Sequence, residues 1–389
     1  MTNDSLSIRS VETFGLSHRL EGTGYGGSKV RVPTRSCTLV KVTTRDGIVG
    51  WGEAFGAPAL TGPALDQLAA QVVGTPVSLR ENRWLTELQV GYHQGIGGPR
   101  VAAMSGLDIA MWDAIARTLG ISISALLGGR ARDSVAVYAS TGYYRGHDEL
   151  PYLEEQLADV VANGFRGAKI KIGGGVDHDV ERVALARSAL GEAVALMIDY
   201  NGSGTVDSAI RSLAALTTFR PYWAEEPLPP EDATGWSRVA ALGIPIAGGE
   251  ALATRYGFRD PISTARLDIV QPDVAKCGGL TEALAITHLA SAWNRTVSPH
   301  CWGTGISQAA TLQLLASLTP PATGMLDRDE LWFELDRGPN PLRDGVLRHP
   351  ILAEAGTVTI PDGHGLGVEI DEDFVRAHAT TVRLTEEDG

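Results

Sequence analysis

The residues most able to do chemistry begin with two lysines in a short apolar stretch. Gly167–Gly173 has the sequence Gly-Ala-Lys-Ile-Lys-Ile-Gly and predicts a strand whose Lys169 and Lys171 point to the same side. At about 7 Å and an effective dielectric of about 20, two ammonium groups repel by roughly 2.4 kcal/mol. That repulsion would lower the pKa of one lysine toward the range of a general base. A lysine pair on a solvated strand face is the alternative.

Acidic residues stand at the ends of the next predicted strands. Asp199, Glu225 and Glu250 follow one another at intervals of about 25 residues, the length of a β/α unit. Carboxylates that converge on one point repel one another unless a cation joins them, and hard oxygen ligands suit Mg²⁺. No His or Cys accompanies them, which argues against zinc. The three acids therefore predict a magnesium site, whereas Glu226, which points to the other side of its strand, is interpreted as a structural or second acid near the site.

A histidine and an aspartate end two further predicted strands. Asp273 and His300 would lie side by side, and a carboxylate next to imidazole fixes its tautomer and raises its basicity. We interpret the pair as a general acid/base dyad, although either residue alone would more commonly be structural. Glu334, at the end of the last predicted strand, could donate a hydrogen bond if protonated.

Together these groups indicate proton abstraction next to a carboxylate. Lys171 and His300 would flank a bound cation, and a base on either side could remove the proton on the carbon adjacent to the substrate carboxylate. The resulting enediolate would be stabilised by Mg²⁺ and by cationic groups such as Lys169. Bases on opposite faces permit racemisation, whereas His300 acting as an acid could expel a β-hydroxyl as water.

The elements that must position these residues follow a regular alternation from 131 to 350. Short apolar strands alternate with helical stretches, and eight such units close a (β/α) barrel whose strand ends share one mouth. A doubly wound sheet is the alternative, but no Gly-rich dinucleotide fingerprint follows any strand. The strand candidates are Val135–Ser140, Ala168–Ile172, Leu196–Asp199, Tyr222–Glu225, Ile246–Gly249, Ile269–Pro272, Thr296–Pro299 and Leu331–Glu334.

Residues 1–130 predict a different, α+β domain. Thr38–Thr43 and Ile48–Glu53 flank an Asp-Gly turn and predict an antiparallel hairpin. Apolar residues at three- and four-residue spacing predict a helix over Ala102–Leu119. The Gly-rich, polar stretch Glu21–Val32 is interpreted as a mobile loop that serves as a lid, with a plain surface loop as the alternative.

Composition narrows the class of protein. The chain has 389 residues, more than the roughly 250 of a plain barrel, so a second domain is expected. A formal net charge of −13 argues against nucleic-acid and anionic-membrane binding. Three dispersed cysteines without a CxxC pair, and no signal-peptide or membrane-spanning run, indicate a cytoplasmic protein with reduced thiols.

These motifs resemble those of the enolase superfamily, specifically its mandelate racemase subgroup. The superfamily's Lys or His base beside Mg²⁺ is a known pattern. The resemblance covers nearly the whole chain. It is carried by Lys-Ile-Lys at 169–171, Asp-Tyr-Asn at 199–201, Glu-Glu-Pro at 225–227, Gly-Glu at 249–250, Pro-Asp-x-x-Lys-x-Gly-Gly at 272–279, His300, Gly106–Asp113, Leu126–Gly129, Pro339–Asp344 and Pro361–Gly367.

The resemblance implies a modified TIM barrel, (β/α)₇β, with an α+β capping domain built from residues 1–130 and the C-terminal tail 351–389. It implies that Mg²⁺ binds the three acids named above, that Lys171 and His300 are the acid/base pair, and that Asp273 supports His300. The muconate-lactonising branch is less similar, because it has a catalytic lysine where Asp273 stands, so Lys276 is not expected to be that base. Residues implied to contact substrate or intermediate oxygens are Ser140, Lys169, Asn201 and Glu334, with Asp327 as the alternative to Glu334.

The expected reaction is the dehydration of an acid sugar to a 2-keto-3-deoxy acid by a hydro-lyase. A racemase or epimerase of a 2-hydroxy or amino acid is the alternative, and a Schiff-base aldolase or a non-catalytic protein would leave the three acids unexplained. We expect a small carboxylate substrate and a homo-oligomer. Lys29 and Arg31 could meet distal hydroxyls or a second carboxylate, and Tyr25 and Trp302 could line the cavity.

Overall fold

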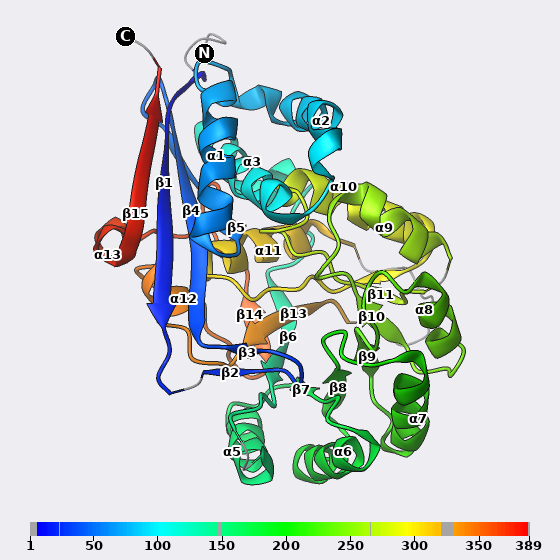
Figure 1. Ribbon diagram of the computed structural model, residues 1–389. Helices are drawn as coiled ribbons and strands as arrows, with labels where there is room; N and C mark the ends of the chain where they lie inside the picture. The colour runs from blue at the N-terminus through cyan, green and yellow to red at the C-terminus, as the bar shows by residue number, and fades with distance from the viewer. Residues whose placement is uncertain (1–5, 23, 147–148, 265, 320–329, 388–389) are drawn as a thin grey trace.

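The computed structural model describes residues 6–22, 24–146, 149–264, 266–319 and 330–387. An antiparallel sheet with helices on one face lies at the upper left of Figure 1, and a parallel barrel with helices around it fills the rest. Both chain ends lie beside the antiparallel sheet. The expected combination of a modified TIM barrel and an α+β cap is confirmed.

The capping sheet joins the two ends of the chain. Its strand order is β15-β1-β4-β5, and every neighbouring pair is antiparallel. The hairpin predicted around the Asp-Gly turn is the β4–β5 pair, with both strands longer than expected. The bounds are β1 (Ile8–Arg19), β4 (Thr34–Thr44), β5 (Val49–Phe55) and β15 (Ala379–Glu386).

Glycines in β5 allow a long helix to lie directly on this sheet. A Cβ at Gly52 would meet the carbonyl oxygen of Gly106 at 2.0 Å, and one at Gly50 would meet that of Ala110 at 2.1 Å. The predicted helix over Ala102–Leu119 is confirmed and begins four residues earlier. The helices on this side are α1 (Pro58–Val72), η1 (Val77–Leu79), α2 (Arg80–Val90), η2 (Gly91–Gln94), α3 (Gly98–Leu119) and α4 (Ile123–Leu126).

The barrel strands run parallel in the order of the chain, and each predicted strand is present. The strands are β6 (Ser134–Thr141), β7 (Gly167–Lys171), β8 (Ala195–Asp199), β9 (Trp223–Glu225), β10 (Ile246–Gly248), β11 (Ile269–Val270), β12 (Thr296–Val297) and β13 (Trp332–Asp336). A helix follows each strand from β6 to β12, which is the (β/α)₇β order. These helices are α5 (Glu149–Ala162), α6 (Val176–Leu190), α7 (Val206–Leu216) with η3 (Thr217–Phe219), α8 (Ala233–Ala240), α9 (Thr254–Ser263), α10 (Gly279–Ala292) and α11 (Gly305–Ser317).

The C-terminal segment returns from the barrel to the cap. Ser298 Oγ donates to the Trp332 carbonyl oxygen (3.3 Å) between the strands β12 and β13, and β14 adds an antiparallel strand beside β6. Beyond β13 the elements are α12 (Pro341–Gly345), β14 (Thr357–Thr359) and α13 (Glu372–His378), which precede β15. The alternative site residue Asp327 lies outside the described residues.

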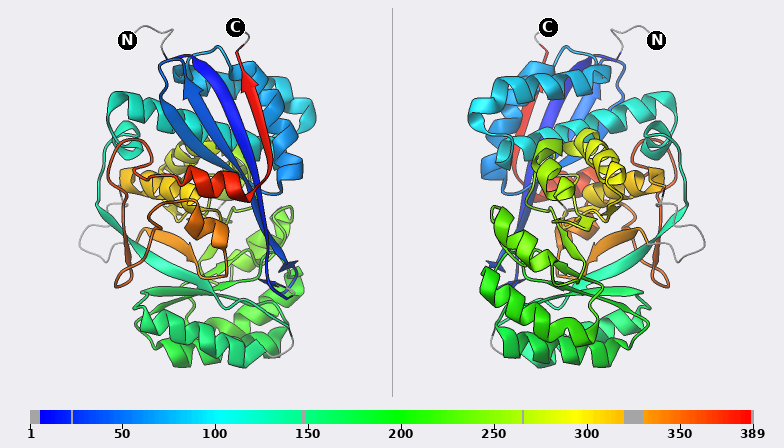
Figure 2. Two further views of the ribbon diagram at one scale, coloured as in Figure 1. Left: turned by 90° about the vertical axis from the view of Figure 1, so that its left-hand side faces the viewer. Right: turned by 90° about the vertical axis from the view of Figure 1, so that its right-hand side faces the viewer.

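The long strands β1 and β4 carry a small hairpin from the cap to the barrel (Figures 1 and 2). This hairpin, β2 (Tyr25–Gly26) and β3 (Arg31–Val32), falls within the stretch expected to be a loop. Gly26 and Tyr144 exchange backbone hydrogen bonds of 3.2 and 2.9 Å, which fasten it to the loop after β6. A second contact joins the cap to the barrel: the Phe55 backbone N–H at the end of β5 donates to the Ala275 carbonyl oxygen after β11 (2.9 Å).

No helix in the described part of the chain is long and apolar enough to cross a membrane. Cys37, Cys277 and Cys301 are buried and form no disulfide, as expected from their spacing.

A buried aspartate between the cap and the barrel should make stability depend on pH. Asp108 of α3 accepts hydrogen bonds from the Thr281 backbone N–H (3.0 Å) and hydroxyl (2.5 Å) on α10. Burial raises the pKa of Asp108 from 3.8 to about 7, so the folded state holds this proton more tightly than the unfolded state. Stability conferred by the protonated form is therefore lost as pH rises from about 4 to about 7.

Urea unfolding of Asp108→Asn and the wild type between pH 5 and 8 tests this. We expect the wild type to lose stability relative to the variant as pH rises to 7, by at most a few kcal/mol, since each pKa unit is worth about 1.4 kcal/mol. The exposed Asp46→Asn is the matched control and should follow the wild type at every pH. A constant difference between the wild type and Asp108→Asn would contradict the prediction.

Candidate active site

The two lysines of β7 are buried and directed into the barrel mouth. Lys169 is fully buried and Lys171 is 7% exposed. Lys169 Nζ lies 2.8 Å from Glu334 Oε1, 3.7 Å from Asp199 Oδ2 and in contact with Glu225 Oε1. Lys171 Nζ lies 2.5 Å from Asp199 Oδ2. The lysine pair therefore belongs to a buried charge cluster, and the solvated-face alternative is wrong.

Strand register brings the acids to these lysines. Lys171 lies opposite Asp199 in the β7–β8 ladder, and Asp199 lies opposite Glu225 in the β8–β9 ladder. Glu250 follows β10, the next strand of the barrel. Parallel strands end at the same mouth, so a 25-residue repeat in the sequence becomes a row of adjacent carboxylates.

Protonation in this cluster differs from the expectation. Burial and Lys169 lower the pKa of Lys171, but Asp199 and other acids outweigh them, and the pKa is raised. Lys169 thus lowers the pKa of Lys171 as predicted, but the acids decide the net direction, which is opposite to the expected fall. Burial also raises the pKa of Glu334, but Lys169 and His300 outweigh it and lower that pKa to about 2. Glu334 is thus ionised, and it accepts a hydrogen bond from Cys301 N–H (3.0 Å) where a protonated donor was expected.

Several buried acids crowd the predicted metal site. Burial and the neighbouring Glu250 and Asp199 raise the pKa of Glu226 to about 8, and its Oε1 is buried without a hydrogen-bond partner. Burial likewise raises the pKa of Glu225 to about 7. Asp199, Glu225, Glu226 and Glu250 thus crowd one corner of the site, where Lys169, Lys171 and His300 are the neighbouring cationic groups. Among the described residues, no group of three or more His, Cys, Asp or Glu side chains is arranged, as the side chains stand, so that it could hold a metal ion. That Asp199, Glu225 and Glu250 hold Mg²⁺ therefore stays a prediction.

The predicted dyad is assembled. His300 Nδ1 lies 2.7 Å from Asp273 Oδ2, and Nε2 lies 3.2 Å from Glu250 Oε2. Burial lowers the pKa of His300, but Glu250, Glu334 and Asp273 raise it more strongly, to about 9. The imidazolium is therefore the main form at neutral pH, with Nδ1–H directed to Asp273. A charged imidazole oriented in this way can donate a proton.

These groups border a cavity of about 290 Å³ between the barrel mouth and the β2–β3 hairpin. Four predicted site residues are buried behind or beside the residues that line this cavity and are not on its wall: Asp273, Lys169, Asp199 and Glu225. The predicted site residues on the wall are Lys29, Ser140, Lys171, Asn201, Glu250, His300, Trp302 and Glu334.

Sequence reasoning missed several other wall residues. Phe55 comes from the end of β5, and Tyr143 comes from the loop after β6. Lys276, Val30 and Val32 also line the cavity. No periodic pattern marks these positions: Phe55 enters the site through the docking of the cap on the barrel, whereas Tyr143 and Lys276 come from barrel loops. Lys276 was considered only as a base, within the Pro-Asp-x-x-Lys motif, and was not assigned to the cavity wall.

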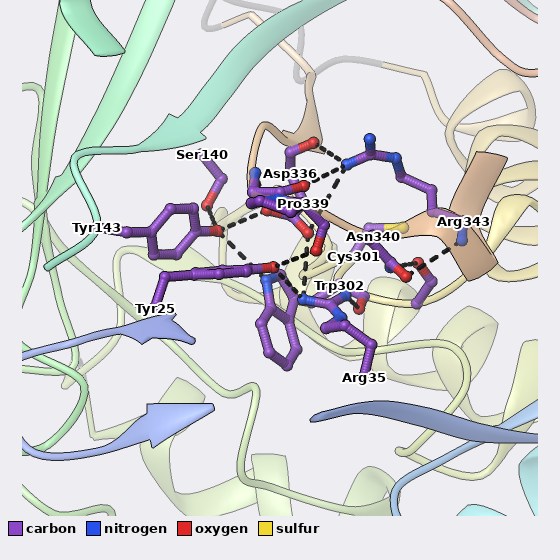
Figure 3. A network of polar contacts seen from close by, with 12 residues as sticks. Tyr25, Arg35, Ser140, Tyr143, Cys301, Trp302, Asp336, Pro339, Asn340 and Arg343 are labelled. Carbon is purple, nitrogen blue, oxygen red and sulfur yellow. Dashed lines mark hydrogen bonds and ion pairs between the residues drawn. The ribbon is translucent and has the colours of Figure 1, made fainter. Parts of the chain in front are cut away.

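Tyr25 does not lie on the cavity wall, so its placement does not support the expected substrate contact. Its hydroxyl donates to the Pro339 carbonyl oxygen (3.3 Å) and accepts from Arg35 (2.8 Å). Figure 3 shows Tyr25 gathered with Tyr143, Trp302 and Arg35 in one polar network. Tyr25 therefore anchors the hairpin to the barrel.

The same network fixes two residues that do face the cavity. The Tyr143 hydroxyl donates to Asp336 (2.8 Å) and accepts from Trp302 Nε1 (3.2 Å). Ser140 Oγ lies 3.4 Å from the same hydroxyl. The Arg35 guanidinium lies 3.3 Å from the centroid of the Trp302 ring and pairs with Asp336 at 3.2 Å. One side of the cavity is therefore held rigid by buried charges.

Comparison with known proteins agrees with this geometry. The model of the "Enolase C-terminal domain-like" family matches residues 152–374, and that of the "Mandelate racemase / muconate lactonizing enzyme, N-terminal domain" matches residues 27–128. The chain belongs to the mandelate racemase subgroup of the enolase superfamily. Within this superfamily, the barrel and cap described above correspond to the two matched domains.

Enolase-superfamily relatives extend over almost all of the chain. A D-galactarolactone cycloisomerase of Agrobacterium fabrum is 39% identical, over 95% of this chain and 97% of the relative. A D-galactonate dehydratase of Xanthomonas euvesicatoria is 31% identical, over 87% and 90%. The crystal structure of the 3,6-anhydro-D-galactonate cycloisomerase from Zobellia galactanivorans is 33% identical and superposes with a TM-score of 0.86, over 96% of this chain and 100% of that one.

Mg²⁺ binding gives a direct test of the acid cluster. Asp199→Asn removes the first carboxylate of the row, so we expect at least about 100-fold weaker Mg²⁺ binding in titration calorimetry. Asp207→Asn, which alters an exposed acid of α7, is the control and should bind as the wild type does. Unchanged affinity in Asp199→Asn would refute the assignment.

Proposed function

We propose that the protein removes the α-proton of an acid-sugar carboxylate and eliminates the oxygen substituent on the β-carbon. The observation that carries this is the placement of Lys171 and His300 on the wall of one cavity, next to a cluster of metal-compatible acids. The names of the relatives support an acid sugar as the substrate.

The proposal gives Lys171 and His300 different tasks. Asp199 and Glu225 would help to hold a divalent cation, and the neutral Lys171 amine would take the α-proton. Mg²⁺ would supply Lewis-acid stabilisation of the negative charge on the substrate carboxylate. Lys169, fully buried between Glu225 and Glu334, would offer a fixed positive charge toward the same oxygens.

The electron pair from the broken C–H bond forms the enediolate and then the double bond between the α- and β-carbons. The bond from the β-carbon to its oxygen breaks, and His300 gives its proton to that oxygen while Asp273 stabilises the imidazolium. If the oxygen is a hydroxyl, water leaves; if it belongs to a ring, the ring opens without loss of atoms. The enol then takes a proton at the β-carbon and becomes a 2-keto-3-deoxy acid.

This proposal unites the two kinds of relative. In the proposed reaction, the leaving oxygen is a hydroxyl for a dehydratase and a ring oxygen for a cycloisomerase. Both reactions need a base at one carbon and an acid at the neighbouring carbon. The higher identity to the cycloisomerase, 39% against 31%, favours including lactones and anhydro sugars among the candidate substrates.

A substrate screen with Mg²⁺ in deuterated water tests the proposal. Acid sugars, their lactones and their anhydro forms are incubated with the enzyme and followed by NMR for 2-keto-3-deoxy products. Deuterium at the α-carbon without elimination would instead support the racemase or epimerase alternative. A complete panel with neither elimination nor exchange would overturn the proposal.

A further inference from the structure

Lys276 is a cavity-wall lysine to which the proposed reaction assigns no role. It lies in the loop after β11, three residues beyond Asp273. Its backbone N–H and that of Cys277 both donate to the Asp273 carbonyl oxygen, at 3.0 and 2.7 Å. Such a tight turn fixes the backbone from which the Lys276 side chain extends. The dyad and Lys276 are therefore held in a constant relation to each other.

The aromatic ring of Phe55 places the Lys276 ammonium on the His300 side of the cavity. Lys276 Nζ lies 5.2 Å from the centroid of this ring, in cation–π range. The same ring meets the His300 ring edge-to-face, with centroids 6.4 Å apart. Phe55 is therefore a common neighbour of the general acid and of Lys276.

Among the described residues, Lys276 takes part in none of the ion pairs of the site. Glu334 pairs with Lys169, Asp199 pairs with Lys171, and both Glu250 and Asp273 pair with His300. No carboxylate of a residue that the structure describes lies within 4.0 Å of Lys276 Nζ, and Glu225, Glu334, Asp199, Glu250 and Asp273 each have another cationic partner. Lys29 adds a second lysine to the wall from the hairpin, likewise without an acid partner in the described part of the chain.

A partly buried ammonium held against an aromatic ring is available to an anion that enters the cavity. The proposed function assigns the reacting carboxylate to Lys169 and to a cation that the acids at the strand ends would hold, so Lys276 is free to serve another group. A cavity of about 290 Å³ is near the lower limit for small-molecule sites, which keeps both ends of a bound sugar acid close to the wall. An ammonium–carboxylate pair in such a place is a strong, charge-assisted hydrogen bond.

We propose that Lys276 binds a second carboxyl function of the substrate, so that the enzyme prefers acid sugars with carboxyl groups at both ends. This inference rests on the proposed function and specifies its substrate class. The second group can be a free carboxylate or the acyl oxygen of a lactone, both of which accept hydrogen bonds from an ammonium group. Lys276 then acts as a specificity-determining residue, and the α-proton is still removed by Lys171.

The test compares two substrate series of equal chain length and stereochemistry, one with a single carboxylate (aldonates) and one with two (aldarates and their lactones). We expect the wild type to have a higher kcat/KM for the dicarboxylic series. Lys276→Met should reduce this preference by about 10- to 100-fold, the range of a hydrogen bond to a charged group. The ratio of the two kcat/KM values cancels any general loss of activity.

Two variants serve as controls. Lys276→Arg keeps the charge and should keep most of the preference. Lys41→Met removes a lysine of the capping sheet that pairs with Glu372, and it should behave as the wild type does. An equal fall of both series in Lys276→Met, or a wild type that favours monocarboxylates, would overturn the inference.

A binding measurement separates this inference from the proposed function. Galactarate and galactonate are titrated into the wild type and Lys276→Met by calorimetry with Mg²⁺ present. If no acid sugar turns over, tighter galactarate binding that depends on Lys276 still supports the role of the lysine while the proposed reaction fails. Equal binding of the two acids by the wild type overturns the role of Lys276 whatever the reaction.

Discussion

Lys171→Met is expected to abolish both α-proton exchange and turnover, with a fall of at least about 1,000-fold, within the range for loss of a general base. The Lys171 amine is the basic nitrogen on the cavity wall at the end of β7, and it lies 2.5 Å from Asp199 Oδ2. Methionine matches its length but cannot take a proton. The measurement is deuterium incorporation at the α-carbon, read by NMR, together with product formation.

Lys171→Arg is the matched variant for this prediction. Methionine leaves Asp199 as a buried charge without its partner, which can itself destabilise the protein. Arginine keeps the positive charge beside Asp199 but does not lose its proton at neutral pH, so it should be equally inactive. A variant of either kind that exchanges the α-proton at a tenth of the wild-type rate would exclude Lys171 as the base.

His300→Asn should separate proton abstraction from departure of the β-oxygen. Asparagine can still hydrogen-bond to Asp273, but it cannot supply the proton that the leaving oxygen needs. We expect product formation to fall by about 100- to 10,000-fold, the typical contribution of a general acid, while α-proton exchange continues. Both rates are read from the same NMR time course.

Asp273→Asn supplies the comparison for this variant. The Asp273 carboxylate lies 2.7 Å from His300 Nδ1 and raises the imidazole pKa, so its removal should weaken elimination without affecting the lysine. If exchange and elimination fall together in His300→Asn, the histidine is the base for this substrate and the assigned roles are reversed.

The sequence could predict those residues of the site that recur with the spacing of one β/α unit. Asp199, Glu225 and Glu250 stand one β/α unit apart, and a barrel converts that spacing into neighbours at one mouth. Their protonation could not be predicted, because it depends on distances between strands. The lysines were expected to act mainly on each other, whereas Lys169 contacts Glu225 and Glu334, and Lys171 contacts Asp199.

The contribution of the cap was beyond the reach of local patterns. Phe55 ends a strand whose counterpart in the site, the loop after β11, lies more than 200 residues later in the chain. Tyr25 was expected to line the cavity from a mobile loop, but it lies in the β2–β3 hairpin, where its hydroxyl accepts from Arg35 and donates to the Pro339 carbonyl oxygen. Such contacts follow from how two domains dock, which no spacing within either domain encodes.

The pairing of β15 with β1 also bears on how the site is made in the cell. β1 leads into the hairpin that covers the cavity, and its outer neighbour in the sheet is a strand from Ala379–Glu386. During synthesis, every catalytic side chain emerges before that strand does. The cap over the cavity therefore depends on a strand pairing between segments more than 300 residues apart, and such non-local pairings are slow to form.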